Sequence, residues 1–439
     1  MLDQIISALQ ARNDLSDWSV RHLEQRGVQL YAVPTAVEAR RLVVAERYAV
    51  EVFRHTSKNG KSMMGSGNAT LLPGDDIDQA LDAAALMAGL VFNQPYTIPG
   101  PAPLPDVLLV DPALDTDAEA ALNGLLERLR NAATTHPHVT LTAAEFAAET
   151  TTTRLRNSRG IDAQQTTTLL QLEWVLVCRE GERESEAFVE MTRRRVADMD
   201  IEGEMARRAQ YALDALRVTA PPLHRGAVVM QGSTLATFLT SNALQVLTSA
   251  SAKFSKFTTV ELEAPIFRGA AVGEPFTAYA NRQLPFGNNS NRFDPDGLPA
   301  QRVPIIRDNY LAAFTANQRY ADYLNIEPTG AFGDLELPAG KTSAAVLTGE
   351  PHIEVASFSW FNPDPITGDF SSEIRLGYVV KNGERIPFRG GALVGNVLAA
   401  LGNAQWSQET GFFGDYHGPT TVRFAGLTVT GEDVDAHTT

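Results

Sequence analysis

The sequence predicts an α+β protein, in which an N-terminal α/β portion is followed by a mostly-β C-terminal domain. In the first half, amphipathic helix patterns alternate with runs rich in β-branched residues. In the second half, turn signals recur and few helical patterns appear. The 439 residues are 44% hydrophobic and 20% charged, so the chain is long enough for two or three domains with buried cores.

Proline placement divides the sequence into domains. Six prolines crowd the stretch 95–115 and exclude helix and central strand there, so we expect a connector. It separates an N-terminal α/β domain, residues 1–94, from a middle α/β domain, residues 116–221. A pair of prolines closes the middle domain. A mostly-β C-terminal domain is expected over 222–430, with a frayed polar tail over 431–439.

The N-terminal domain begins with a predicted helix. Apolar residues at near-helical spacing favour a helix over Asp3–Gly27, which the final glycine would end. The runs Val28–Val33 and Arg41–Arg54 are rich in β-branched residues and are predicted strands. Asp75 can cap a further helix that runs to Ala88.

The middle domain combines two helices with three strands. Helices are predicted over Thr116–Ala132 and Gly203–Leu216 from their apolar periodicity. Strands are predicted over Val139–Thr142, Thr150–Leu155 and Ala163–Cys178. Threonine and glutamine at alternate positions suggest sheet faces in contact with water.

The C-terminal domain opens with a short buried strand, Gly226–Met230. Ser233 or Thr234 can cap a single helix over Leu235–Ala250. From Phe257 onward, strands and turns alternate.

Composition excludes several classes of function. The formal net charge is -15 and the pI is about 5.0, so direct binding to nucleic acid is not expected. The single cysteine, Cys178, can form neither an internal disulfide nor a cysteine-rich zinc site. No targeting segment and no apolar stretch of membrane-spanning length is visible, so we expect a cytoplasmic protein that does not enter a membrane.

No complete catalytic motif is present in the sequence. There is no His-Glu-x-x-His or His-Glu-x-x-x-His pattern and no Gly-x-Ser-x-Gly elbow. His136 and His138 flank a proline and are expected to be exposed loop histidines rather than metal ligands. The residues alone therefore predict a protein of two or three domains without a recognisable active site.

Four runs of the second half nevertheless resemble the TldD/PmbA family, a family of metallopeptidases also described as modulators of DNA gyrase. These runs are Arg292–Phe314, which contains Phe-Asp-Pro-Asp-Gly, Arg319–Gly330, Asn362–Ser371, which contains Thr-Gly-Asp-Phe-Ser, and Gly377–Asn396. Arg156–Ile161 and Ser66–Leu90 resemble the family in the first half. The similarity is ordered and covers most of the chain, so it implies a TldD/PmbA-like fold.

Within this family, the chain resembles the zinc-less TldE/PmbA-type subunit. The zinc-bearing subunit carries His-Glu-x-x-x-His on a helix, whereas the corresponding helix here reads Phe238-Leu-Thr-Ser-Asn-Ala-Leu-Gln. The degenerate zinc-motif positions fall near Thr240, Ser241 and Gln245, none of which replaces an imidazole pair and a general base. The late cysteine ligand is missing too. We therefore expect no catalytic residue and no cofactor in this chain.

The resemblance implies partners. A zinc-bearing TldD-type subunit would complete a heterodimer around an enclosed cavity in which small or unfolded peptides are cut. The same surface could instead form a homodimer. This chain would close the chamber and grip the peptide, for which a sheet edge in the β-rich half is suited. The turn that contains Thr367, Gly368, Asp369 and Phe370 is expected near the peptide cavity, with a plain structural turn as the alternative.

Two other functions stay open at this point. A divergent active metallopeptidase would need a rebuilt metal site, for which His352, Asp415 and His417 are weak candidates. A regulatory binding protein, for example a modulator of DNA gyrase, would need a protein partner, which the acidic charge permits.

Overall fold

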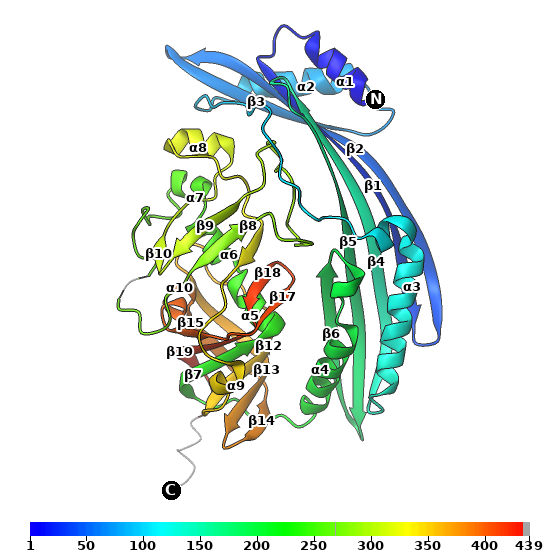
Figure 1. Cartoon of the computed structure of the whole chain (residues 1–439), viewed down its shortest axis with the longest axis vertical. Helices are drawn as coiled ribbons and strands as arrows, with labels where there is room; N and C mark the ends of the chain where they lie inside the picture. Colours follow the sequence, from blue (N-terminus) through cyan, green and yellow to red (C-terminus); the bar gives the residue numbers. More distant parts are fainter. Residues whose placement is uncertain (268, 433–439) are drawn as a thin grey trace.

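The computed structural model describes residues 1–267 and 269–432, and Figure 1 shows their arrangement. A long curved sheet made by the first half of the chain stands beside a C-terminal half that contains two further sheets. Helices and many strands coexist and the C-terminal half is mostly sheet, so the α+β prediction is confirmed. Most of the predicted frayed tail, from residue 433 on, lies outside the described residues.

Six antiparallel strands form the first sheet in the order β3-β2-β1-β4-β5-β6. The strands are β1 (Asp17–Val33), β2 (Ala36–Lys58), β3 (Lys61–Leu71), β4 (Val139–Asn157), β5 (Asp162–Glu180) and β6 (Arg183–Arg193). The first three strands precede the proline-rich stretch and the last three follow it. The structure therefore joins the predicted domains 1–94 and 116–221 through one sheet.

Four helices cover one face of this sheet. They are α1 (Leu2–Gln10), α2 (Ile77–Leu90), α3 (Pro112–Thr134) and α4 (Ile201–Asp214), and a short 3-10 turn, η1 (Val196–Asp198), precedes α4. Alternate strand residues such as Val20, Val50 and Trp174 point toward these helices and are buried. The opposite face turns toward the C-terminal half (Figure 1).

The predicted helix over Asp3–Gly27 is wrong beyond Gln10. Residues from Asp17 onward belong to β1. Trp18 and Val20 are buried two residues apart, which is the strand period, whereas Leu23 is only partly buried. The near-helical spacing of Trp18 and Leu23 was therefore a coincidence of two strand positions.

Two glycines of β3 let α2 approach the sheet. A Cβ atom at Gly67 would lie 1.9 Å from the carbonyl oxygen of Ala84, and one at Gly65 would lie 1.8 Å from that of Ala88. Both oxygens belong to the backbone of α2. Only glycine therefore fits at these two positions of β3.

The C-terminal half is built from two sheets. One has the order β12-β7-β19-β15-β13-β14, with β16 added on β19, and the other has the order β10-β9-β8-β11-β18-β17. The strands are β7 (His224–Gln231), β8 (Ala278–Asn281), β9 (Arg302–Arg307), β10 (Tyr310–Leu311), β11 (Asp334–Glu336), β12 (His352–Phe358), β13 (Asp369–Lys381), β14 (Glu384–Phe388), β15 (Ala392–Asn396), β16 (Ala404–Trp406), β17 (Thr410–Phe413), β18 (Tyr416–Pro419) and β19 (Thr421–Val429). One continuous apolar core, which includes Phe238, Trp406 and Phe424, joins them.

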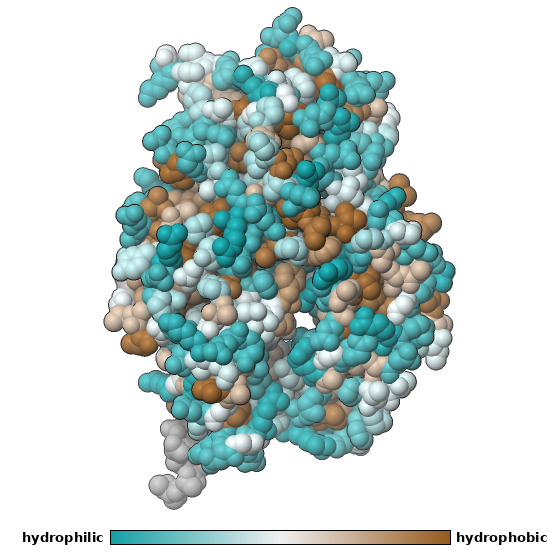
Figure 2. Space-filling view, viewed as in Figure 1, coloured by the Kyte–Doolittle hydropathy of each residue, from teal (hydrophilic) through white to brown (hydrophobic). Residues whose placement is uncertain are grey.

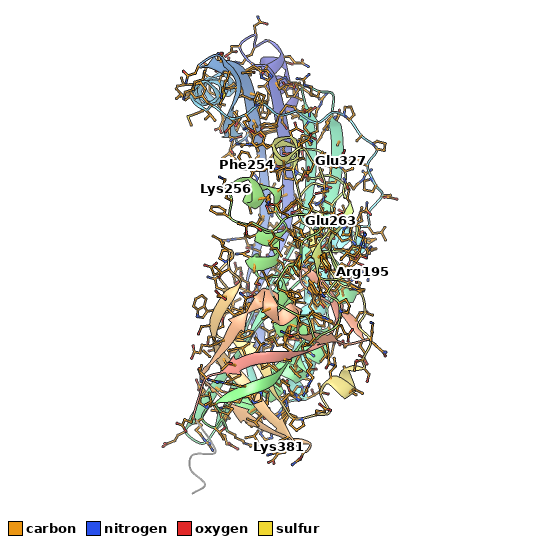
Figure 3. All side chains as sticks on the ribbon, turned by 90° about the vertical axis from the view of Figure 1, so that its left-hand side faces the viewer. Arg195, Phe254, Lys256, Glu263, Glu327 and Lys381 are labelled. Atoms are coloured by element: carbon orange, nitrogen blue, oxygen red, sulfur yellow. The ribbon has the colours of Figure 1, made fainter. Side chains whose placement is uncertain are left out.

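Short helices connect the strands of this half. They are α5 (Gly232–Leu239), α6 (Asn242–Leu247), α7 (Ala250–Phe254), α8 (Gln318–Leu324), α9 (Ala344–Leu347) and α10 (Val397–Leu401). In the side view of Figure 3, Phe254 and Lys256 lie toward the upper end of this half, and Lys381, in the turn after β13, lies at its lower end. No helix among the described residues is long and apolar enough to cross a membrane.

The single helix predicted over Leu235–Ala250 is wrong, because the segment is broken into α5, α6 and α7. At each break a threonine hydroxyl bonds to the carbonyl four residues back: Thr240 to Ala236 and Thr248 to Leu244, both at 2.9 Å. Thr237 makes the same bond to the carbonyl of Ser233 inside α5, at 3.0 Å, so such a bond can bend a helix without ending it. Ser241 then takes an extended conformation, with φ -56° and ψ 152°, so the chain turns before α6.

Candidate functional site

A cavity of about 470 Å³ lies between the first sheet and the C-terminal half. Its walls are β5 and β6 with Glu204 of α4 on one side, and α5, the loop at 288–289 and the β17–β18 turn on the other. Figure 2 shows an opening between the two halves at the level where β6 faces α5 in Figure 1. Segments distant in sequence therefore meet around one hollow.

The wall supplied by α5 is polar. Ser233, Thr237 and Thr240 recur at helical spacing and line the cavity. The other face of α5, with Leu235 and Phe238, is packed in the core. This amphipathic pattern fixes which side of the helix meets the cavity.

The facing wall is the edge strand β6, which pairs with β5 on one side and with no other strand among the described residues. The carbonyl of Thr192 accepts a hydrogen bond from Asn288 Nδ2 at 3.1 Å, so it points outward. By the alternation of antiparallel strands, Phe188 and Glu190 also present their N–H and C=O groups outward. A second cavity of about 410 Å³ continues along Glu184–Phe188 of the same strand.

Charges around the first cavity are partly compensated. Glu204 of α4 is buried and accepts hydrogen bonds from Arg208 Nε at 2.6 Å and Arg207 Nε at 2.9 Å. Burial alone would raise the pKa of Glu204, but the two guanidinium groups outweigh it and hold the pKa below its ordinary value. The Glu204 carboxylate is therefore charged and already engaged in two ion pairs within the protein.

Arg193 is the cationic group of the lining. Its guanidinium donates to the backbone carbonyls of Thr192, at 2.7 Å, and Phe412, at 2.9 Å. Burial lowers its pKa, and no carboxylate among the described residues lies within 4 Å of it. On the opposite wall, Asp415 accepts only a long hydrogen bond, 3.4 Å, from Asn288 Nδ2. Arg193 and Asp415 thus offer the cavity a cation and a carboxylate with free bonding capacity.

The lining does not fit a catalytic zinc ion. Its carboxylates are Glu190, Glu204 and Asp415, and within the described part of the chain it contains neither histidine nor cysteine. Catalytic zinc sites in proteins rely on imidazole or thiolate ligands. The cavity walls are therefore suited to binding a polar ligand rather than to metal-assisted hydrolysis.

The structure places the degenerate zinc-motif positions apart. Thr240 lines the cavity beside β6, whereas Gln245 lines another cavity of about 340 Å³ together with Asp294 and Asp296. Ser241 lies between them and donates to the carbonyl of Phe238. The break between α5 and α6 causes this separation.

The turn at residues 367–370 is held by its own hydrogen bonds. The Asp364 side chain accepts from the backbone N–H of Thr367 at 2.7 Å, and Asn396 Nδ2 donates to Asp369 Oδ1 at 2.9 Å. Gly368 has φ +79°, and Phe370 is buried in the apolar core. These four residues lie outside the lining of the cavity beside β6, and their role toward a peptide stays a prediction.

The weak alternative site does not assemble into a ligand cluster. His352 begins β12 and is buried, with Nδ1 2.7 Å from the carbonyl oxygen of Glu350, and burial lowers its pKa. Asp415 and His417 belong to the β17–β18 hairpin of the other sheet. Among the described residues, no group of three metal-ligating side chains within 4.8 Å of one another includes any of these three.

Sequence reasoning missed the strand that matters most to this site. β6 was not predicted, although Val189 and Met191 are buried on alternate positions and Gly181 forms the preceding turn with φ +62°. A hairpin signal after β5 was therefore present in the sequence. It was weak because charged residues separate the apolar ones.

Comparison with known proteins identifies the family of the chain. Residues 228–431 match the model of the PmbA/TldA metallopeptidase C-terminal domain. The C-terminal half of the chain therefore belongs to the TldD/PmbA family. An uncharacterized protein from Methanocaldococcus jannaschii is 23% identical over 303 residues, which are 65% of this chain and 68% of that protein.

Solved structures share the whole fold of this TldD/PmbA family member. TldE from Thermococcus kodakarensis matches 98% of this chain and 100% of its own length, with a TM-score of 0.81 and 16% identity. A proposed modulator of a DNA gyrase from Thermotoga maritima matches with the same coverage, TM-score and identity. Another proposed modulator of DNA gyrase, from Bacteroides thetaiotaomicron, has a TM-score of 0.77 and 17% identity, and 98% of each chain is covered. At these identities the structures show the fold alone.

Proposed function

We propose that this chain is the non-catalytic, peptide-binding subunit of a TldD/PmbA-type metallopeptidase complex. The observation that carries the proposal is the edge of β6, which opens into a cavity whose lining, within the described part of the chain, contains neither histidine nor cysteine. An extended peptide can add to such an edge through main-chain hydrogen bonds, which bind many sequences alike. The metal and the cleavage chemistry then belong to a zinc-bearing TldD-type partner.

The surroundings of β6 support selection for unfolded chains. The C-terminal half faces this edge, with α5 and the β17–β18 turn on the first cavity and Ser357–Ser359 on the second. A folded protein rarely offers a free extended strand, whereas a short or unfolded peptide can enter between the two halves. The edge is also shielded by this position from pairing with other sheets, which is the usual hazard of an exposed edge strand.

The polar groups of the first cavity support a role in orienting the peptide. Arg193 and Asp415 have free bonding capacity, so they can meet a peptide carbonyl or terminal carboxylate and a peptide N–H or terminal amine, respectively.

Reconstitution of the complex tests the proposal. Hydrolysis of a fluorogenic unfolded peptide is measured for this chain, for a zinc-bearing TldD-type protein, and for the two together. We expect no hydrolysis by this chain alone and metal-dependent hydrolysis by the mixture. Hydrolysis by the isolated chain that survives chelation of metals would refute the non-catalytic role.

A cavity-filling variant tests the peptide path. Thr237→Trp places a large side chain on the cavity face of α5, and we expect it to lower kcat/KM of the reconstituted complex at least tenfold. The matched control is Thr134→Trp, an exposed threonine at the end of α3 with a similar local hydrogen bond. Equal activity of the Thr237→Trp complex and the control complex would place the peptide elsewhere.

A further inference from the structure

A histidine and two carboxylates converge on one face of the β1–β2 ribbon, away from the cavity. His22 and Glu24 lie two residues apart on β1, and Glu46 lies directly opposite Glu24 on β2. His22 Nε2 is 2.9 Å from Glu46 Oε1 and 3.6 Å from Glu24 Oε1. One ligand atom of each residue lies within 4.8 Å of the other two.

The arrangement places two carboxylates directly opposite one another across the strand pair. Like charges directly opposite one another destabilise a pair of strands, and Glu24 and Glu46 form such a pair. Among the described residues, no lysine or arginine lies within 4 Å of either carboxylate. The pKa of Glu46 lies below its ordinary value, first because the Tyr48 hydroxyl donates to it and then because of His22, with a smaller influence from the N-terminal ammonium group. A divalent cation would replace the repulsion with attraction to both carboxylates.

The imidazole is already oriented for a ligand. Its ring stacks on Tyr48, with centroids 4.4 Å apart and planes 3° from parallel. The Tyr48 hydroxyl donates to Glu46 Oε1, which fixes that carboxylate in turn. The His22 side chain is 12% exposed, that of Glu46 37% and that of Glu24 60%, so one side of the cluster stays open to water.

We propose that His22, Glu24 and Glu46 bind one divalent transition-metal ion of the Zn²⁺ class. One imidazole nitrogen with two carboxylate oxygens is a donor set that Zn²⁺ accepts, whereas Mg²⁺ and Ca²⁺ prefer oxygen ligands alone. The ion would tie β1 to β2 in the stretch between the core under α1 and α2 and the core under α3. Its role is a structural staple of the ribbon, separate from peptide cleavage.

Calorimetric titration of the isolated, metal-free and tag-free chain with Zn²⁺ tests this site. We expect one equivalent to bind, with at least tenfold weaker binding in Glu24→Gln and in His22→Phe, and with much weaker binding of Mg²⁺. Glu24→Gln is the decisive variant, because Glu24 is exposed and its one ionic contact with the described residues is that at 3.6 Å to His22. His22→Phe retains an aromatic ring over Tyr48.

A second variant controls for binding at other histidines. The double change His136→Ala and His138→Ala removes the loop pair after α3, and we expect it to leave the affinity for Zn²⁺ unchanged. Unaltered affinity in Glu24→Gln, loss of binding in the His136 and His138 variant, or no binding by the wild-type chain would each overturn the proposal. Since the titration uses no peptide and no partner, its outcome is independent of the proposed peptide-binding role.

Discussion

Glu51 allows a quantitative test of how the two halves of the molecule are held together. It lies on the face of β2 that turns toward the C-terminal half, close to Asp296. Burial first, and the nearby Asp296 carboxylate second, raise the pKa of Glu51 from 4.5 to about 7, while Arg319 and Arg21 act in the opposite direction. The charged form of Glu51 is therefore disfavoured in the folded protein.

The sign of the effect on stability follows from this raised pKa. Glu51 stabilises the folded state fully below pH 4.5, where it is protonated in both states, and this contribution is lost as the pH rises through 7. Since each pKa unit is worth about 1.4 kcal/mol, the full difference is about 3 kcal/mol. Solvent reaches part of this side chain, so we halve the value to about 1.5 kcal/mol.

Glu51→Gln removes the titrating group. We expect the variant to be more stable than the wild type by about 1.5 kcal/mol at pH 8, and nearly equal to it at pH 4.5. Urea unfolding at both pH values measures the difference. Glu38→Gln, an exposed change in the same strand, is the control and should show no such pH dependence. A Glu51→Gln variant no more stable than the wild type at pH 8 would refute the reasoning.

Two further changes probe close packing and a buried cation. In Gly67→Ala, the added Cβ would lie 1.9 Å from the Ala84 carbonyl oxygen, so we expect a loss of about 2 kcal/mol. The control is Gly124→Ala on α3, where an added Cβ atom meets no atom within 4 Å, and this variant should be more stable than the wild type by about 0.5 kcal/mol or more. Thermal melting measures both variants. Equal melting temperatures would contradict the steric argument. Arg282 is 1% exposed and donates to the carbonyls of Leu298, Pro299 and Thr329, so Arg282→Met should cost about 3 kcal/mol or more in urea unfolding because these acceptors lose their partner. Arg154, whose side chain is more exposed and pairs with Asp162, provides the control. Arg154→Met should lower the free energy of unfolding by about 1 kcal/mol or less. Similar losses in both variants would show that burial does not decide the effect.

Local patterns in the sequence predicted several elements well. The helices expected over Thr116–Ala132 and Gly203–Leu216 appear as α3 and α4, shifted by a few residues. The strand expected over Ala163–Cys178 appears as β5. In each case the period of the buried residues matches the element, so the pattern is local and visible in the sequence.

The candidate site could not be predicted in the same way. Its walls come from Glu190–Arg193, Ser233–Thr240, Asn288–Asn289 and Phe413–Asp415, and only tertiary packing brings these segments together. The resemblance to the family suggested Thr240, Ser241 and Gln245 as degenerate zinc-motif positions, which stays a prediction, and it did not indicate the cavity. The sequence suggested that a peptide would bind to a sheet edge in the β-rich C-terminal half, whereas we propose the edge strand β6 of the first sheet. Which strand lies at the edge of a sheet is known only once all strand pairings are known.

The interruption between α5 and α6 has a consequence for protein engineering. Substituting His, Glu and His at Thr240, Ser241 and Gln245 would restore the letters of the family's metal motif, but these positions serve two different hollows of the molecule. A designer who wished to recover a metal centre here would first have to join α5 and α6 into one continuous helix. With the present path of the main chain, restoring these three letters would not bring the three side chains to one cavity.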